Sequence, residues 1–322
     1  PYAVWSPDST RIATFRMDQR NVSDMHLLQY VPGNDTRSRP WSYRFATPGD
    51  EIIPMYEPVV VDVAQKKNIA VQSPAQPEVS LMDTEDDVLQ WWGDDGRTLY
   101  SLYAQRGEKA LQLLQTDPAT GKTEMLLEEK GSTFLEANLN YASPPNIRIL
   151  KSGNVIWFSE KDGYGHLYLY GLDGKEKNAI TSGNWAVRDL LYVDENTSQV
   201  FFLAGGREVG RDPYYRHLYR VGLDGRGLQL LTPEDADHNV AIDPSGMAFL
   251  DTYSTVEEPP VSVLRNRNGS IILNLETADI QNLKDTGWMP PERFSVKALD
   301  GQTDLYGLLF KPTSFNASKN IP

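Results

Sequence analysis

The chain has 322 residues, and its 44 Asp and Glu outnumber its 31 Lys and Arg, giving a net charge of −13. Hydrophobic residues make up 40% of it, enough for a large core, so the composition excludes wholesale disorder. The acidic balance, without a Lys/Arg cluster, argues against nucleic acid as a partner. The sequence contains no apolar run of about eighteen residues, so it predicts no membrane-spanning segment. The first residues show no leader pattern, so we expect no signal peptide.

The chain contains no cysteine, which excludes disulfides, thiolate metal sites and cysteine nucleophiles. Large extracellular animal domains usually carry disulfides, so we expect a bacterial source. The expected compartment is the periplasm or the cell envelope, with the cytoplasm as the alternative.

A turn rich in Asp, Ser, Asn or Gly, followed by a short apolar strand, recurs along the chain. The turns are Ser6–Ser9, Gly93–Gly96, Lys151–Asn154, Asp194–Asn196 and Asp243–Gly246. The strands expected after them are Arg11–Phe15, Thr98–Tyr103, Val155–Ser159, Gln199–Leu203 and Met247–Asp251. From the second turn onward the copies lie roughly 40 to 60 residues apart, the length of a four-stranded propeller blade. The longer first interval predicts an insertion around Asn34–Asp50.

A second turn follows four of these strands. These turns are Asp117–Gly121, Asp173-Gly174, Asp224-Gly225 and Asn268-Gly269. Asp-Gly and Asn-Gly suit tight hairpins, whose central residues need positive φ. The strongest internal match, His-Leu-Tyr-X-X-Gly-Leu-Asp-Gly, occurs at His166–Gly174 and His217–Gly225, and each copy precedes a strand ending in Thr. The pattern predicts an all-β fold, an arc of about five four-stranded propeller blades, with a short helix at Glu276–Leu283.

The residue types that carry chemistry form no complete catalytic set. Gly-X-Ser-X-Gly is absent. His166 and His217 share one register in neighbouring repeats, and His238 has no second His or Glu at a ligand spacing, so all three are expected to be structural. Four adjacent carboxylate pairs are expected in solvated turns, because neighbouring strand residues point to opposite faces. They are Asp86-Asp87, Asp94-Asp95, Glu128-Glu129 and Glu257-Glu258. We predict no metal and no cofactor.

Several segments carry a family resemblance. They are Trp5–Ala13, Arg16–Val22, Tyr43–Phe45 with Pro48–Glu51, Glu160–Tyr168 and Ile180–Trp185. In this order they resemble the dipeptidyl peptidase IV branch of the prolyl oligopeptidase family. The hairpin expected from Phe294–Leu299 and Leu305–Phe310 belongs to no blade. It is similar to the strands by which that family passes from its propeller into an α/β-hydrolase domain.

The resemblance implies a serine exopeptidase that removes N-terminal dipeptides with Pro or Ala at the second position. The propeller of that family has eight blades, gates access and helps to hold the peptide. We therefore expect residues 1–290 to be a propeller domain lacking its N-terminal part and 291–322 to be truncated entry strands of the hydrolase domain. The amine-anchoring Glu pair is expected before Pro1 and the Ser-Asp-His triad beyond Pro322, so we expect no catalytic residue in this chain. The implied partners are a peptide substrate, the chain's own C-terminal hydrolase domain and a second copy in a homodimer.

The segment Asn138–Asn146 is predicted to be a loop, since it holds tandem prolines and no alternating apolar pattern. In the resembled family the corresponding stretch contributes to the second substrate subsite. Tyr141 is therefore the best candidate for a substrate contact, with Asn138 and Asn140 beside it. The alternative is that Tyr141 packs on its own blade.

Two other functions remain open at the sequence level. The repeats alone equally permit a free-standing binding propeller, or a propeller glycosidase with two carboxylates across a central pocket. The closing hairpin Phe294–Phe310 favours the peptidase, because a free-standing propeller has no use for it.

Overall fold

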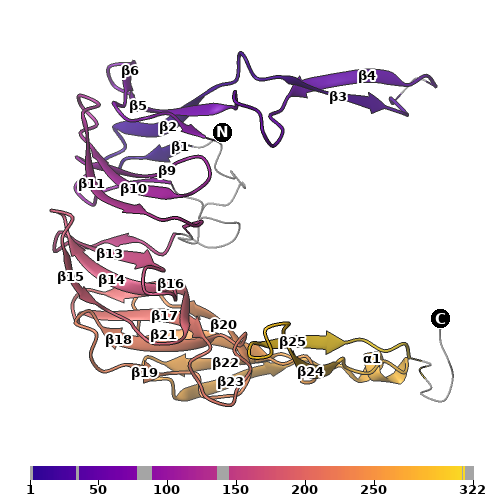
Figure 1. The fold of residues 1–322 in the computed structure, drawn as a ribbon. Helices are drawn as coiled ribbons and strands as arrows, with labels where there is room; N and C mark the ends of the chain where they lie inside the picture. Colours follow the sequence, from indigo (N-terminus) through magenta and orange to yellow (C-terminus); the bar gives the residue numbers. More distant parts are fainter. Residues whose placement is uncertain (1–2, 34–35, 78–88, 136–144, 314, 316–322) are drawn as a thin grey trace. The chain divides into compact units, whose positions relative to one another are not determined.

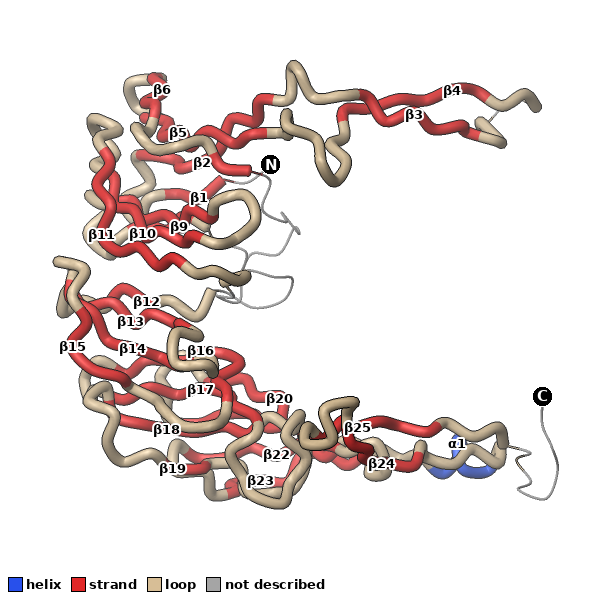
Figure 2. The backbone as a smooth tube through the Cα atoms, viewed as in Figure 1, coloured by secondary structure: helices blue, strands red, loops and turns tan. Residues whose placement is uncertain are grey.

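The computed structural model describes residues 3–33, 36–77, 89–135, 145–313 and 315. They fall into two compact units, Pro1–Thr181 and Ser182–Pro322. Almost every regular element is a strand (Figures 1 and 2), and the single helix within these residues is α1 (Gln281–Asp285). None of the described helical structure is long and apolar enough to cross a membrane.

Among its described residues, unit Pro1–Thr181 contains three antiparallel blade sheets and a separate two-stranded hairpin, described below. The first has the order β1 (Ala3–Trp5), β2 (Arg11–Asp18), β5 (Met55–Asp62) and β6 (Lys67–Ala70), with β7 (Gln76–Pro77) also paired to β5. The second comprises β8 (Gln90–Trp92), β9 (Leu99–Ala104), β10 (Ala110–Thr116) and β11 (Thr123–Lys130). The third comprises β12 (Arg148–Ile149), β13 (Asn154–Ser159), β14 (His166–Gly171) and β15 (Glu176–Ala179).

Unit Ser182–Pro322 contains two four-stranded antiparallel sheets and a separate hairpin among its described residues. The first sheet comprises β16 (Ala186–Asp194), β17 (Gln199–Gly205), β18 (His217–Gly222) and β19 (Gln229–Leu230). The second comprises β20 (Asp237–Ile242), β21 (Ala248–Ser254), β22 (Val261–Asn266) and β23 (Ile271–Thr277). The hairpin pairs β24 (Glu292–Lys297) with β25 (Asp304–Leu309).

The predicted repeats are confirmed, since each predicted turn joins the first and second strands of one of these five sheets, and each predicted strand is the second strand of its sheet. Two boundaries were wrong. The insertion begins before Asn34, because β3 (Asp24–Gln29) and β4 (Arg39–Arg44) form a hairpin whose exposed faces give no alternating apolar pattern. The helix predicted at Glu276–Leu283 is shorter and begins later, because residues up to Thr277 pair with β22 as part of β23.

Neighbouring sheets bury their apolar faces against one another, as propeller blades do. In the first unit Leu102, Leu113 and Trp157, from the second and third sheets, belong to one buried cluster. In the second unit Phe201 and Phe249 come from different sheets and share another. Each fully buried side chain of this size contributes about 1.5–3 kcal/mol relative to exposure.

The outer turns of three sheets abut the preceding sheet. A Cβ built on Gly121 would lie 2.1 Å from the carbonyl oxygen of Ala70, which ends β6. On Gly174 it would lie 2.6 Å from the corresponding oxygen of Leu126, in β11. Gly269 repeats the contact in the other unit, 2.4 Å from the oxygen of Leu231. These close approaches require glycine in addition to the positive φ of the turn.

Candidate functional site

The repeated His-Leu-Tyr motif lies on β14 and β18, the third strands of their sheets. In each sheet it forms hydrogen bonds with a Thr that follows the fourth strand, β15 or β19. His166 Nδ1 lies 3.0 Å from Thr181 Oγ1, and Leu167 N–H donates to the same hydroxyl at 2.9 Å. In the next copy, Leu218 N–H donates to Thr232 Oγ1 at 2.9 Å. The predicted structural role of this register is therefore confirmed.

His217 differs from its counterpart in its hydrogen bond and its neighbour. Its Nδ1 lies 3.0 Å from the backbone oxygen of Thr232, while its buried Nε2 has no hydrogen-bond partner in the described structure. The ring lies 5.2 Å from that of His238. Burial lowers the pKa of His217 below the ordinary histidine value, because the imidazolium would lose its hydration.

The tyrosines of the motif anchor the loops that precede them. Tyr168 Oη–H donates to Asp162 at 2.8 Å, and Tyr219 Oη–H donates to Glu208 at 2.9 Å. Burial, assisted by these carboxylates, raises the pKa of both phenols, so they remain hydrogen-bond donors. Each copy of the motif therefore contributes hydrogen bonds that hold neighbouring segments of its sheet together.

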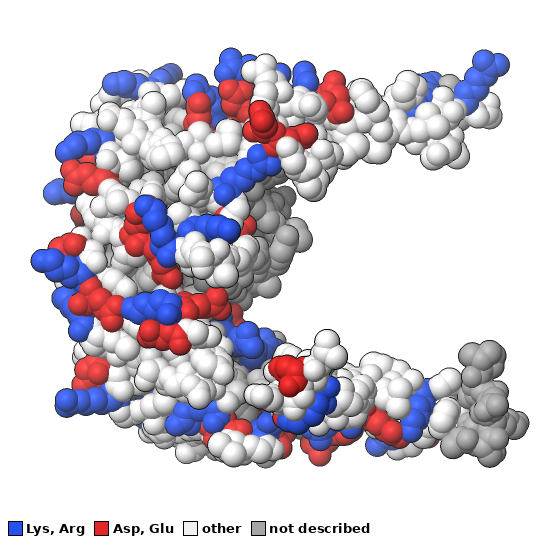
Figure 3. Space-filling model, in the orientation of Figure 1, with Lys and Arg blue, Asp and Glu red and all other residues white. Residues whose placement is uncertain are grey.

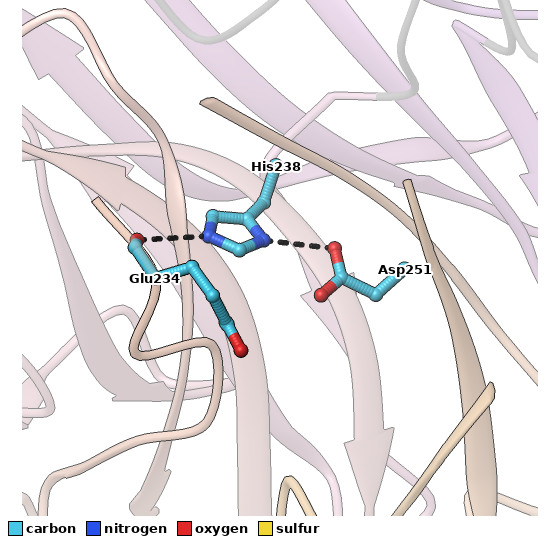
Figure 4. Close-up of side chains that lie close together, drawn as sticks. All are labelled: Glu234, His238 and Asp251. Carbon is cyan, nitrogen blue, oxygen red and sulfur yellow. Dashed lines mark hydrogen bonds and ion pairs between the residues drawn. The ribbon is translucent and has the colours of Figure 1, made fainter. Parts of the chain in front are cut away.

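A largely buried polar network joins side chains from β20, β21 and β22 and from the loop before β20. Figure 4 shows three of its members, Glu234, His238 and Asp251. His238 Nδ1 lies 2.8 Å from Asp251 Oδ1, and His238 Nε2 lies 3.2 Å from the backbone oxygen of Glu234. The Arg265 guanidinium donates to Asp251 at 2.8 Å and to the Glu234 carboxylate at 2.7 Å. His238 and Asp251 are fully buried and Arg265 nearly so.

This network has ligand types that a metal could use, but its charges do not fit one. One ligand atom from each of Glu234, His238 and Asp251 lies within 4.8 Å of the others. Arg265 already bridges both carboxylates, and its positive charge would repel a cation there. The arrangement fits a buried ion-pair network, in agreement with the predicted structural role of His238. Sequence reasoning missed Asp251 and Arg265, whose strand positions carry no distinctive spacing.

The Glu128-Glu129 pair is not in a solvated turn, so that prediction was wrong. Both residues belong to β11, where Glu129 accepts hydrogen bonds at 2.6 Å from Trp157 Nε1 and from Ser159 Oγ in the next sheet. It lines a cavity of about 360 Å³ together with Lys161. Glu128 also borders this cavity, and its carboxylate accepts a hydrogen bond at 2.7 Å from Gln112 Nε2, directly opposite on β10.

Two of the other three carboxylate pairs lie in turns or bends. Glu257 and Glu258 occupy a bend whose amides donate to Thr255 Oγ1, and Asp94-Asp95 lies in a turn, as predicted. The pair Asp86-Asp87 lies outside the described residues.

The three predicted substrate-binding residues, Asn138, Asn140 and Tyr141, lie outside the described residues, so their role stays a prediction. The described chain resumes at Pro145. There Arg148 Nη1 donates to the backbone oxygens of Pro145 at 2.7 Å and of Ile147 at 2.8 Å. Burial lowers the pKa of Arg148.

Comparison with known proteins decides the family. Residues 2–260 match the model for the dipeptidyl peptidase IV (DPP IV) N-terminal region. The chain belongs to the DPP IV family. A relative described as dipeptidyl-aminopeptidase B, from Neosartorya fischeri, is 26% identical over 99% of the chain. One described as a dipeptidyl aminopeptidase, from Schizosaccharomyces pombe, is 21% identical over 99%. The chain spans 36% and 41% of these two DPP IV relatives.

Solved structures show the same fold. A Bacteroides ovatus protein described as a dipeptidyl aminopeptidase IV matches 99% of the chain with a TM-score of 0.78 and 24% identity, over 46% of its own length. Porphyromonas gingivalis dipeptidyl peptidase 4 also matches 99%, with a TM-score of 0.78 and 20% identity, over 43% of its length. The predicted DPP IV propeller fold is thereby confirmed. These curated relatives are fungal and these structures bacterial, so the expected bacterial source stays a prediction.

Proposed function

We propose that the chain is the propeller domain of a DPP IV-type serine exopeptidase and acts with an α/β-hydrolase domain that supplies the Ser-Asp-His triad. The family match over residues 2–260 carries this proposal. The hairpin β24–β25 supports it, because within the described part of the chain it pairs with no blade sheet. In this role the propeller gates access and helps to position peptides with Pro or Ala at the second position.

The two alternative functions are less well supported. A free-standing binding module leaves the hairpin β24–β25 without a purpose. A glycosidase needs two carboxyl groups about 5–10 Å apart and open to a sugar. The carboxylates of Glu234 and Asp251 come together, but both are held by Arg265 and Asp251 is fully buried.

We further propose a homodimer formed through the hairpin β3–β4, and a location in the periplasm or cell envelope. Trp41, Tyr43 and Phe45 form an exposed aromatic row on this hairpin, with centroids 4.8 and 5.6 Å apart. On the face that Figure 3 shows, the hairpin is largely uncharged along its middle and carries Lys or Arg side chains at its tip. An isolated two-stranded hairpin is marginal in water, and a two-fold axis would place this row against its own copy.

The function is tested by comparing residues 1–322 with the product of the full-length gene on alanyl-prolyl p-nitroanilide. We expect turnover by the full-length protein and none by residues 1–322, because hydrolysis needs a nucleophile activated by a base. The control is the full-length protein with its downstream catalytic Ser changed to Ala. A full-length protein without turnover, or one that cleaves aryl glycosides, would contradict the proposal.

A further inference from the structure

The hairpin β24–β25 has two unlike faces. From the strand register, one face is wholly apolar in its middle and uncovered. It carries Phe294, Val296, Leu305 and Leu309, each about half exposed. The other face, with Arg293 and Tyr306, borders a pocket of about 590 Å³, which Phe294 also lines and whose opposite wall is the loop between β17 and β18. This pocket therefore separates part of the hairpin from the β17–β18 loop.

Few side chains bridge this pocket, and Arg293 makes the polar contacts. Its Nη2 lies 2.9 Å from Glu257 Oε2, and its Nε donates to Glu257 Oε1 at 3.2 Å. Its Nη1 donates to Tyr215 Oη at 3.1 Å. The rings of Tyr214 and Tyr306 meet edge to face at 6.0 Å. A paired guanidinium and carboxylate define direction as well as distance, because the two parallel hydrogen bonds are planar.

The partners of Arg293 are themselves fixed. Tyr215 is 8% exposed, and its amide donates to the oxygen of Asp212 within the β17–β18 loop. Glu257 follows β21 in a bend whose amides donate to the hydroxyl of Thr255. The bond to Glu257 raises the pKa of Arg293, so the guanidinium stays charged at any working pH. The Arg293 side chain thus connects the hairpin to the β17–β18 loop and to the bend after β21.

We propose that Arg293 is a latch that holds the hairpin β24–β25 in one orientation on unit Ser182–Pro322. Without it, the hairpin pivots about the Tyr214–Tyr306 contact. Under the proposed function this hairpin begins the hydrolase sheet, so Arg293 acts as a positioning residue for that domain. This last consequence rests on the proposed function, whereas the latch itself does not.

Hydrogen exchange of residues 1–322 tests the latch directly. We expect Arg293→Gln to speed exchange of the β24–β25 amides about 5- to 10-fold, with β20–β22 unchanged, since a partly exposed ion pair and one hydrogen bond are lost. Glu257→Gln should act in the same direction. In the double variant, the β24–β25 amides should exchange little faster than in the stronger single variant, because the two substitutions remove the same interaction. The matched control is Glu258→Gln, which removes the neighbouring carboxylate, one that does not pair with Arg293.

Exchange in Arg293→Gln that equals exchange in Glu258→Gln would overturn the latch. If Arg293→Gln unfolds the unit, Glu257→Gln removes the ion pair and leaves Arg293 in place, and hairpin exchange in that variant equal to exchange in Glu258→Gln would overturn the latch in the same way. In the full-length protein, Arg293→Gln should lower kcat/KM at least about three-fold, and unchanged kinetics would overturn its positioning role. A wild-type full-length protein without turnover would count against the proposed function alone, since exchange in residues 1–322 still decides the latch.

Discussion

Gly121 is required for two physical reasons of different origin. Its φ of +75° is a property of the turn, which the Asp117–Gly121 sequence predicts. The 2.1 Å approach of a Cβ to the oxygen of Ala70 is a property of packing between sheets. Gly107 allows the effect of backbone strain to be measured without the steric contact, because it has a φ of +86° but nothing within 4 Å of its Cβ position.

Gly121→Ala should therefore destabilise the protein more than Gly107→Ala. We expect about 1 kcal/mol of lost unfolding free energy for Gly107→Ala, from backbone strain alone. For Gly121→Ala we expect about 2–4 kcal/mol, because the backbone of β6 must also move. Chemical denaturation followed by circular dichroism measures both. Equal losses would show that the contact with Ala70 relaxes at little cost.

Arg265 pairs with the fully buried carboxylate of Asp251 and with the partly exposed carboxylate of Glu234, so its removal leaves the buried charge of Asp251 without compensation. We expect Arg265→Met to lower the free energy of unfolding by about 3–5 kcal/mol. Arg226→Met is the control and should change it by less than about 0.5 kcal/mol, because that side chain is 88% exposed. Since Arg265 occupies the carboxylates, neither zinc nor a chelator should move the Tm of the wild type, and a metal-dependent rise would contradict the ion-pair assignment.

At the scale of the strand, the two His-Leu-Tyr copies give β14 and β18 the same scaffold but different electrostatics. His217 has its pKa lowered by burial, so the unfolded chain takes up a proton more readily than the folded one. The stabilising contribution of neutral His217 is complete above the ordinary value of 6.5 and is lost as pH falls from there through the folded pKa. The protein should therefore lose stability on acidification over that range.

His217→Gln should flatten the fall in unfolding free energy between about pH 7 and pH 5. His26→Gln, at an exposed position on β3, should leave the slope as in the wild type. Urea denaturation at several pH values measures the slopes. Equal slopes for His217→Gln and the wild type would mean that His217 titrates alike in both states.

Substitutions on the two faces of the hairpin β3–β4 test the proposed dimer. Trp41 and Leu28 lie on opposite faces of it, and both are about half exposed. Trp41→Gln should weaken self-association about 10-fold or more, as expected for an aromatic anchor at an interface centre. Leu28→Gln should weaken it less. Sedimentation velocity over a range of concentrations gives both constants. A wild-type protein that stays monomeric would refute the dimer.

At the scale of the whole molecule, the predicted role of Tyr141 can be tested only together with the proposed hydrolase domain. In the full-length protein, Tyr141→Ala should lower kcat/KM by an amount worth about 1–2 kcal/mol, because a wall contact and one hydrogen bond to the peptide are lost. Tyr164→Ala, which alters a half-exposed tyrosine in a turn, is the control. Unchanged kinetics with a lower Tm in Tyr141→Ala would show that the residue packs on its own blade.

The sequence by itself determined the repeating architecture. Turn chemistry and strand alternation act over a few residues, so they could be seen without any tertiary contact. The two copies of the motif at His166 and His217 placed their side chains in one register, and the structure gives them matching positions. The closing hairpin was also predictable, because its Asp300-Gly301 turn lies between two apolar runs.

Tertiary structure alone decided which polar groups meet. Glu129 finds Trp157 across 28 residues, and His238 finds Asp251 across 13, in each case because packing brings different strands together. The exposed strand β3 escaped detection because burial, which creates an alternating pattern, does not act on it. Arg293 likewise meets Glu257, 36 residues earlier in the chain, only because tertiary folding brings the hairpin β24–β25 to the bend after β21. Local preferences are short in range, whereas partners for buried charge are chosen by the assembled sheets.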